Sequence, residues 1–351
     1  MYHIGMDMHK KFSSVEVIDE EGNLIDKRVL FHHDQEKIRK YFSNIGQNGT
    51  VTLEATRNWY WLFELLEEEG LRVKLAHPSK VRLIAEARIK TDSIDACTLA
   101  NLERTGYLPE AYIPSRDVRD NRELLRYRLS LVRIRTSLKN RIHAILDKLG
   151  IGHPFSDLFG KKGREFLRAL PLREIYRKEL DGYLSTIEFL DEILKGITKR
   201  IQTSLEKDPK AKLLMSIPGI SYLTAHLLLC EIGDIKRFPS AKRLCSYAGI
   251  VPRTHQSADR IWHGPITKQG NRYIRWAMVE AVHVAVIKDP VLAIFYKRLK
   301  KEKGAAKARV AVARKLLVAV YHVLKRKERY KFNSLTRIHL GKPCDLTGHL
   351  Q

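Results

Sequence analysis

Cysteine is scarce in this 351-residue sequence, which contains four, at Cys97, Cys230, Cys245 and Cys344. They stand far apart, without the paired spacing of a zinc site or a redox dithiol. We therefore expect reduced thiols of the kind found in the cytoplasm, and no zinc site.

Long apolar runs are missing as well. None approaches the roughly 20 residues that span a bilayer, and the first residues lack the basic-then-apolar pattern of a signal peptide. We expect a cytoplasmic protein without a membrane partner. The length suggests about two domains, and the hydrophobic content of 44% is ordinary for a soluble protein.

Acidic charge is in short supply over most of the chain. The sequence has 64 Lys+Arg against 40 Asp+Glu, a net charge of +24, yet residues 1–115 hold 15 basic and 18 acidic residues, a net of −3. The remaining residues therefore carry +27, which suggests a polyanion partner. Nucleic acid fits better than a membrane surface, because the basic helices lack a bulky lipid-seeking face. The simpler alternative is that this positive net charge only keeps the protein soluble.

Residues 1–115 begin with three apolar or alternating segments, followed by alternating helical and extended patterns. We predict strands at Tyr2–Asp7, Ser14–Asp19, Leu24–Leu30, Thr50–Glu54 and Leu71–Ala76, and helices at Asp34–Tyr41, at Asn58–Glu69, and from Ser79 and Asp92. This is the element order of an α/β, ribonuclease-H-like domain.

Residues 116–210 carry two long, charged helical patterns, from Arg116 to about Gly150 and over about Leu180–Leu205, on either side of the glycine-rich residues 150–163. They predict a long helical, coiled-coil-like linker arm, which implies self-association. A plain helical bundle explains the same pattern equally well.

Residues 211–335 are expected to form a mainly α C-terminal domain, and residues 336–351 an irregular tail. The helices of this C-terminal domain are predicted around residues 213–230 and at Ser240–Gly249, Asn271–Val286 and Lys303–Lys327. In the first of these regions Ile217-Pro218-Gly219-Ile220-Ser221 separates two apolar helices, as in a helix-hairpin-helix element. Backbone N–H groups at the Gly219 turn would then bind a phosphate, although many such turns bind nothing.

Four carboxylates of residues 1–115 suit a metal site: Asp7, Glu54, Asp92 and Asp95. The first two end predicted strands, and the last two share a face at the start of a helix. Strand ends and helix starts converge on one edge of an α/β sheet. Clustered carboxylates need a cation, and Mg²⁺ or Mn²⁺ suits their hard oxygens and would clamp a phosphodiester. Simpler explanations need no metal: Asp92 only stabilises the positive end of its helix dipole, and Asp7 or Glu54 is only a half-exposed residue at a strand end.

A polar stretch around Ser257, from Arg253 to Arg260, lies in the most basic part of the sequence, and we predict it to be a loop. Its serine is a candidate nucleophile. Ser246 is the rival, but it lies in a helical, apolar pattern. Candidate phosphate ligands near this stretch are Arg253, Arg260, Lys268, Asn271 and Arg272, and candidate proton carriers are His255 and His263.

Two sets of short motifs carry a family resemblance. The first set is Gly5-Met6-Asp7, Glu54-Ala55-Thr56, His77-Pro78 and Lys90-Thr91-Asp92-Ser93-Ile94-Asp95-Ala96. The second is Ile217-Pro218-Gly219-Ile220, Glu231-Ile232-Gly233-Asp234, Phe238, Tyr247-Ala248-Gly249-Ile250-Val251-Pro252, Ser257 and Ile266-Thr267-Lys268-Gln269-Gly270-Asn271-Arg272. With these motifs the chain resembles, along nearly its whole length, the DEDD-type insertion-sequence transposases of the IS one-ten group, the bridge-RNA-guided serine recombinases.

The resemblance implies a RuvC-like domain, a helical arm and a C-terminal transposase domain. It implies that Asp7, Glu54, Asp92 and Asp95 bind Mg²⁺ and that Ser257 attacks DNA, forming a covalent 5′-phosphoserine intermediate during strand exchange. It also implies a prokaryotic, nucleoid-associated homo-oligomer, dimer to tetramer, whose structured guide (bridge) RNA selects donor and target DNA.

Two residues depart from the family pattern, Ala258 and Arg57, each where glycine is usual. Alanine is a small change unless its position needs a positive φ. Two other functions stay open. A RuvC-like nuclease would cut DNA with metal-activated water and form no covalent adduct. A non-catalytic basic nucleic-acid-binding protein would bind in a salt-sensitive way without metal dependence.

Overall fold

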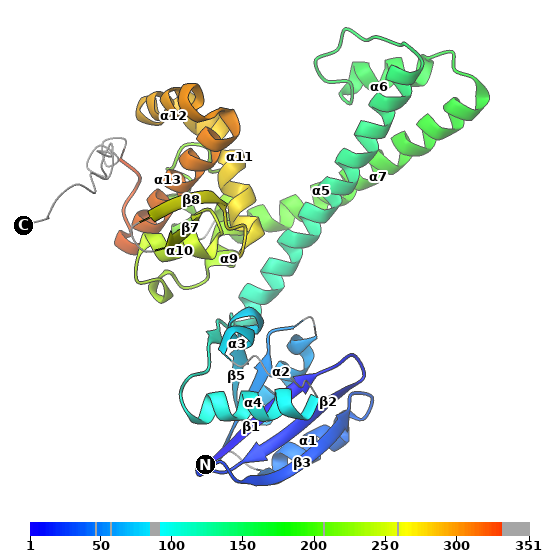
Figure 1. Ribbon diagram of the computed structural model, residues 1–351. Coiled ribbons are helices and arrows are strands. Elements are labelled where there is room, and N and C mark those ends of the chain that lie inside the picture. Colours follow the sequence, from blue (N-terminus) through cyan, green and yellow to red (C-terminus); the bar gives the residue numbers. More distant parts are fainter. Residues whose placement is uncertain (46–47, 57, 85–91, 206–207, 258–259, 332–351) are drawn as a thin grey trace, which may run out of the picture. The chain divides into compact units, whose positions relative to one another are not determined.

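The computed structural model describes residues 1–45, 48–56, 58–84, 92–205, 208–257 and 260–331. The chain divides into two compact units, Met1–Pro114 and Ser115–Gln351, which are described separately below (Figure 1). The family departures at Arg57 and Ala258 and the predicted tail 336–351 lie outside the described residues.

Unit 1 is built on a six-stranded mixed sheet in the order β3-β2-β1-β4-β5-β6. The strands are β1 (Tyr2–Met8), β2 (Phe12–Ile18), β3 (Leu24–Phe31), β4 (Gly49–Glu54), β5 (Arg72–Ala76) and β6 (Glu110–Ala111). Short turns make β1, β2 and β3 antiparallel, whereas helical crossovers make β1, β4 and β5 parallel. The parallel strands therefore end at the same edge of the sheet.

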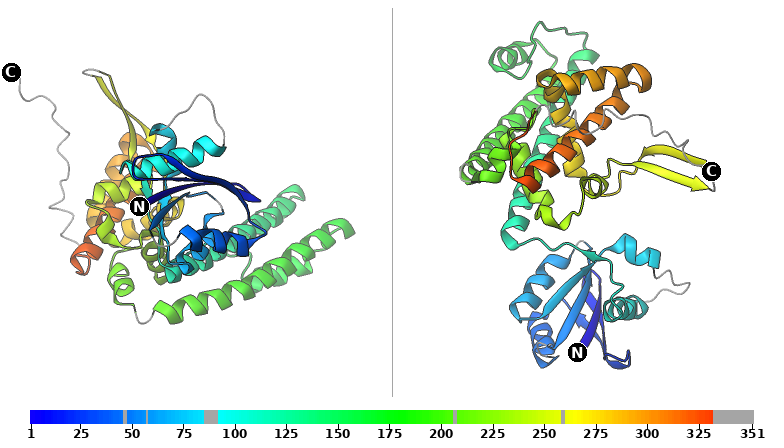
Figure 2. Two further views of the ribbon diagram at one scale, coloured as in Figure 1. Left: turned by 90° about the horizontal axis from the view of Figure 1, so that it is seen from below. Right: turned by 90° about the vertical axis from the view of Figure 1, so that its left-hand side faces the viewer.

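Helices cover both faces of this sheet (Figure 2). The covering helices are α1 (Gln35–Ile45), α2 (Trp59–Glu68) and α4 (Asp92–Arg104), and the short helix α3 (Pro78–Ile84) follows β5. On one face, α1 and α2 bury Phe42 and Leu62 against strand side chains such as Met6 and Leu53. On the other face, α4 packs across β1 and β2. Strand β1 is therefore buried along nearly its whole length, as expected for a strand that is covered on both faces.

The predicted α/β domain is confirmed, and its element order is consistent with a RuvC-like fold. Strand β2 begins at Phe12, two residues earlier than predicted, because Ser13 and Ser14 are buried inside the sheet despite their polar side chains. Strand β6 was not predicted, since two residues are too short to show an alternating pattern.

Unit 2 begins with two long helices, α5 (Arg116–Lys148) and α7 (Glu174–Leu205), with α6 (Lys161–Ala169) at their far end. The long helices run antiparallel, because Arg135 contacts Asp191 while Arg128 donates to the Thr198 hydroxyl at 3.0 Å. Near α6 they close on a small core of their own. The two long helices of this region thus form a helical hairpin.

The base of this hairpin belongs to the main core of unit 2, to which Leu125, Leu129 and Ile201 contribute. The structure therefore groups the hairpin with the following residues in one compact unit. The further helices are α8 (Pro209–Leu214), α9 (Tyr222–Ile232), the 3-10 turn Ile235–Arg237, α10 (Ala241–Tyr247), α11 (Arg272–Lys288), α12 (Pro290–Lys303) and α13 (Ala305–Arg326). The predicted helical C-terminal region is confirmed.

The loop predicted around Ser257 is wrong. Strands β7 (Pro252–Ser257) and β8 (Arg260–Ile266) pair as an antiparallel hairpin that stands out from the helices of unit 2 in the right-hand view of Figure 2. Its polar sequence lacks the apolar alternation that identifies a half-buried strand. Helix α12 was also missed, although Asp289 caps it by accepting from Val291 N and Leu292 N.

The described cysteines, Cys97, Cys230 and Cys245, form no disulfide. Burial raises the pKa of Cys230 to about 12 and that of Cys245 to about 11, so both remain protonated and poorly nucleophilic. No helix among the described residues is both long and apolar enough to cross a bilayer.

A buried charge ties three helices of unit 2 together. The Glu231 carboxylate of α9 is fully buried and accepts two hydrogen bonds from Arg126 of α5, at 2.9 and 3.0 Å. It also accepts one from Asn271, the N-cap of α11, at 2.7 Å. Burial alone would lower the pKa of Arg126, but the bonds to Glu231 outweigh it and raise this pKa. Buried carboxylates are costly unless paired in this way.

We expect Glu231→Ala to lower the free energy of unfolding of unit 2 by about 3–5 kcal/mol, because it leaves Arg126 without its buried partner. Urea titration followed by helical circular dichroism measures this change. Glu123→Ala is the control: this exposed carboxylate lies 3.6 Å from the same guanidinium and should contribute less than about 1 kcal/mol. Equal effects of the two changes would contradict the proposed role of Glu231.

Candidate active site

The carboxyl end of β1 and the start of α4 form a compact group of metal-ligating side chains. Asp7 lies in β1, Asp92 opens α4, and His9 follows β1 in the turn to β2. The His9 Nε2 atom lies 3.1 Å from Asp7 Oδ2 and 3.0 Å from Asp92 Oδ2. One ligand atom from each residue lies within 4.8 Å of the other two, so a single cation has room to contact all three.

Gly5 explains why α4 reaches this position. A Cβ at Gly5 would lie 1.8 Å from the Ala96 carbonyl oxygen and 2.7 Å from Ala100 N, so only glycine lets the helix backbone pack this closely. The helix runs opposite to β1, because His3 near the start of the strand contacts Glu103 near the end of the helix. The first turn of α4 is therefore carried to the end of β1, where Asp7 lies.

Glu54 and Asp95 stand next to this group but are not members of it. Glu54 ends β4, the parallel neighbour of β1, whose last register pair is Met6 with Leu53. The next position along the two strands brings Asp7 and Glu54 to the same level. Asp95 lies one turn into α4, and both carboxylates are half-buried and engaged in interactions. The structure thus brings together Asp7 and Asp92 and places the other two residues beside them.

The donor set fits a small divalent cation. The His9 Nε2 atom is buried and, among the described residues, forms no hydrogen bond of ordinary geometry, although two carboxylate oxygens lie within 3.1 Å. Carboxylate oxygens suit Mg²⁺ or Mn²⁺. His9 was absent from the predicted site, and its signal in the sequence is its position two residues after Asp7 at the strand end.

The hairpin β7–β8 carries Ser257 at the end of its first strand. In its register Ser257 pairs with Arg260 and His255 pairs with Trp262. The hairpin is thus a polar ribbon, and the indole of Trp262 is exposed. Ala258 lies outside the described residues, and so do the side chains of Ser257 and Arg260.

The base of this hairpin is fixed to α10 and α11. Thr267 N donates to Val251 O at 2.9 Å, and Asn271 N donates to Tyr247 O at 2.6 Å. Gly270 has a φ of +122°, and a Cβ there would lie 2.2 Å from Tyr247 O. The Gly270-Asn271 motif therefore holds the hairpin in place, which sequence reasoning did not foresee.

The predicted phosphate ligands fall into two groups. Asn271 uses its amide to cap α11 and to bind Glu231, and a Cβ at Gly219 would point at the Ala281 carbonyl oxygen of α11, 2.2 Å away. These two residues therefore have structural contacts, and their role as phosphate ligands stays a prediction. Arg253, Lys268 and Arg272 are exposed on unit 2, and for them the role of phosphate ligand stays a prediction.

The turn at Gly219 connects α8, a helix of six residues, to α9, whose N-cap Ser221 accepts from Thr224 N. This is a helix-turn-helix connection, and its assignment as a phosphate-binding helix-hairpin-helix stays a prediction. The rival nucleophile Ser246 is exposed near the end of α10.

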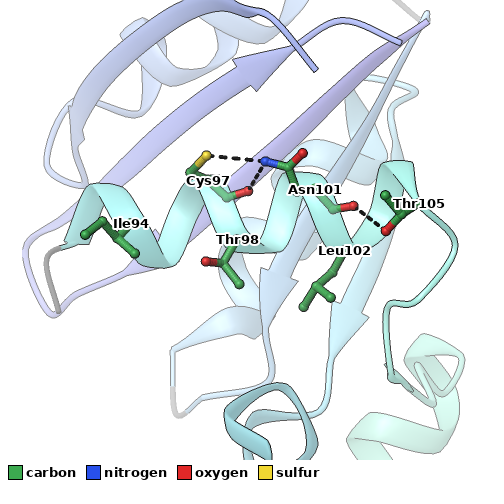
Figure 3. A pocket seen from close by; sticks show the side chains of 6 residues that line it. All are labelled: Ile94, Cys97, Thr98, Asn101, Leu102 and Thr105. Carbon is green, nitrogen blue, oxygen red and sulfur yellow. Dashed lines mark hydrogen bonds between the residues drawn. The ribbon is translucent and has the colours of Figure 1, made fainter. Parts of the chain in front are cut away.

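A hollow of about 310 Å³ on α4 is lined by residues of that helix and by Thr105, which directly follows it (Figure 3). Asn101 donates to the Cys97 carbonyl oxygen at 3.2 Å, and Thr105 donates to Asn101 O at 2.7 Å. These polar groups are used within the helix, so the hollow offers a ligand few free partners.

Two family models match the chain. Residues 4–151 match a model described as a transposase, the DEDD transposase model of the IS110 type. Residues 211–297 match the model described as the transposase IS116/IS110/IS902 family. The first segment contains Asp7, Glu54, Asp92 and Asp95, and the second contains Ser257.

Curated relatives agree with these matches. The chain is 25% identical over 348 residues to the transposase for insertion sequence element IS1111A of Coxiella burnetii, covering 93% of this chain and 91% of the relative. It is 25% identical over 300 residues to a probable family 20 transposase of Pseudomonas aeruginosa, covering 81% and 83%. It is 39% identical over 133 residues to the pilin gene-inverting protein of Moraxella bovis, covering 37% and 41%.

We expect Gly5→Ala to destabilise unit 1 by about 1–3 kcal/mol, because the new methyl group pushes α4 away from β1. Calorimetric unfolding of the full chain measures this change. Gly182→Ala in α7 is the control, since no atom lies within 4 Å of the added methyl group and a helical Gly→Ala change stabilises by up to about 1 kcal/mol. A Gly5→Ala protein as stable as the parent would rule out the close packing described here.

We expect Asp7→Asn and His9→Ala each to weaken Mn²⁺ binding by about tenfold or more, because each removes a ligand or its charge. Titration of free Mn²⁺ by electron paramagnetic resonance measures the affinity. Glu36→Gln in the exposed first turn of α1 should leave it unchanged. If His9→Ala binds Mn²⁺ like the parent, His9 is not part of the site.

Proposed function

Since the chain belongs to the DEDD transposases of the IS110 group and is a DNA transposase, we propose that it exchanges DNA strands through a covalent intermediate at Ser257. Membership means that it acts on DNA and indicates dependence on a divalent metal. The serine, the identity of the metal as Mg²⁺, and a guide RNA belong to the proposal.

The proposed reaction conserves the energy of the phosphodiester bond. The Ser257 hydroxyl attacks a DNA phosphorus, its proton is taken up by a base, and the bond to the 3′ oxygen breaks. The products are a 5′-phosphoserine and a free 3′-hydroxyl, which gains a proton. A 3′-hydroxyl of the partner strand then attacks the phosphoserine, which restores the serine and completes the exchange without ATP.

Four carboxylates would hold the metal: Asp7, Glu54, Asp92 and Asp95. His9 would complete this donor set through its Nε2 atom. A bound divalent cation would supply charge stabilisation to the attacked phosphate. The exposed cations Arg253, Lys268 and Arg272 would hold neighbouring phosphates, with Arg260 beside Ser257 in the hairpin register.

The carboxylates belong to unit 1 and the serine belongs to unit 2. The proposed reaction therefore needs residues of both units. We propose a homo-oligomer, dimer to tetramer, as the active form. The net charge of +24 supports a further polyanion, and we propose a structured guide RNA encoded by the element. A cytoplasmic, nucleoid-associated location stays a prediction.

One observation carries the metal part of this proposal: a strand end and a helix start, far apart in the sequence, each bring a carboxylate oxygen, from Asp7 and from Asp92, to within 3.1 Å of the same imidazole nitrogen. Like charges held this close repel unless a cation lies between them. The simpler reading of these residues as separate exposed acids leaves this convergence without a reason.

The test is a suicide substrate, a nicked DNA carrying the joined ends of the element, from which the cut fragment diffuses away and leaves any covalent adduct trapped. The parent protein should give a detergent-stable adduct with Mg²⁺. We expect Ser257→Ala to abolish it and Ser246→Ala to retain it, because only the first removes the attacking oxygen. Asp92→Asn should also lose it.

An adduct of normal yield with Ser257→Ala would refute the assignment of the nucleophile. Metal-dependent cleavage by the parent without any adduct would instead identify a RuvC-like nuclease that uses an activated water.

A further inference from the structure

A cavity of about 850 Å³ opens beside the candidate metal group, lined by residues 9–12 and 31–33. It lies where β1 turns into β2 and where β3 ends. Its lining combines aromatic rings with the ammonium groups of Lys10 and Lys11, both exposed. The proposed reaction uses none of these residues except His9.

The rings form a continuous strip that begins at the metal group. The His9 and Phe12 ring centroids lie 4.6 Å apart, those of Phe12 and Phe31 lie 6.3 Å apart, and those of Phe31 and His33 lie 5.8 Å apart. Phe12 and Phe31 are direct register partners of β2 and β3, so their side chains lie on the same face of the sheet. That face also carries Asp7, because Asp7 pairs with Ser14, two residues from Phe12.

One wall of the cavity is held rigidly. The His32 Nε2 atom lies 2.7 Å from the Ser13 hydroxyl, and its ring meets the edge of Trp61 at 4.9 Å. Burial lowers the pKa of His32, which favours the neutral ring. Phe31, by contrast, is 54% exposed at the end of β3. Phe31 is thus an exposed phenyl ring at a strand end that is held in place by its neighbour His32. Together with two nearby lysines, such a ring can bind a planar anionic ligand.

We propose that this strip binds unpaired nucleotides of the DNA strand next to the phosphate held at the carboxylates. Bases would stack on Phe31 and Phe12, while Lys10 and Lys11 neutralise the backbone phosphates. Every base has a π-face, so such stacking tolerates any sequence. DNA is the ligand because the strip adjoins the site proposed to cut it, and its bases are unpaired during strand exchange. This inference rests on the proposed function.

Photocrosslinking of the full chain tests the inference locally. The probe is a short oligodeoxynucleotide that contains 5-iododeoxyuridine, and mass spectrometry locates the crosslinks. We expect crosslinks at Phe31 or Phe12 in the parent, and at least a fivefold lower yield there with Phe31→Ala. Val29→Ala is the matched control, because Val29 lies on the same strand face, is 53% exposed and does not line the cavity. It should leave the yield unchanged.

A second test measures the affinity of the protein for single-stranded oligonucleotides. Phe31→Ala should weaken binding of oligodeoxythymidine but not of the same backbone with abasic residues, whereas Lys10→Ala with Lys11→Ala should weaken both and flatten the salt dependence. A loss seen only with oligouridine would assign the strip to RNA and overturn the proposal. An altered oligomeric state with unchanged crosslinking would identify a contact between copies, with the same consequence.

The outcomes separate this inference from the proposed function. If crosslinks map elsewhere while the Ser257-dependent adduct forms, the strip is wrong and the recombinase proposal stands. If the parent forms no adduct although crosslinks appear at Phe31, the strip binds DNA for a different reaction.

Discussion

The close packing of α4 on β1 is the constraint on which the candidate site depends. At Gly5 the helix backbone approaches so closely that a single methyl group would lie 1.8 Å from a carbonyl oxygen. This contact fixes the height of the helix along the strand, and with it the position of Asp92 opposite Asp7. The fold therefore holds two like charges together, an unfavourable arrangement for the apoprotein that a cation would relieve. Stability and metal binding are thus coupled in unit 1.

Unit 2 also contains a carboxylate whose charge must be neutralised. There the buried charge of Glu231 is neutralised within the protein, by Arg126 and by the amide of Asn271. Because Asn271 also caps α11 and binds the chain at Tyr247, the network reaches the base of the hairpin that carries Ser257. Unit 1 places carboxylate oxygens of Asp7 and Asp92 within 3.1 Å of one imidazole nitrogen, whereas unit 2 uses its buried charge to support the base of the hairpin that carries Ser257.

The sequence predicted most helices and strands of unit 1, because their apolar periodicities are clear and their turns are short. The carboxylates could be chosen as candidate metal ligands because they stand at the ends of these clearly predicted strands and helices. His9 was not selected, because its one signal is its position two residues after Asp7 and its role depends on contacts with α4. The strands of the serine hairpin were missed because Thr254, His255 and Gln256 are polar on both faces. Glu231 was recognised as part of a motif, but its burial between helices is a tertiary feature that spacing does not reveal.

The central claim is that Asp7 and Asp92 share one divalent cation. Anomalous diffraction from crystals of the protein grown with Mn²⁺ tests it most directly. We predict an anomalous peak bonded to carboxylate oxygens of both residues and to the His9 Nε2 atom. A peak bound elsewhere, with Asp7 and Asp92 separated or paired only to protein cations, would contradict it.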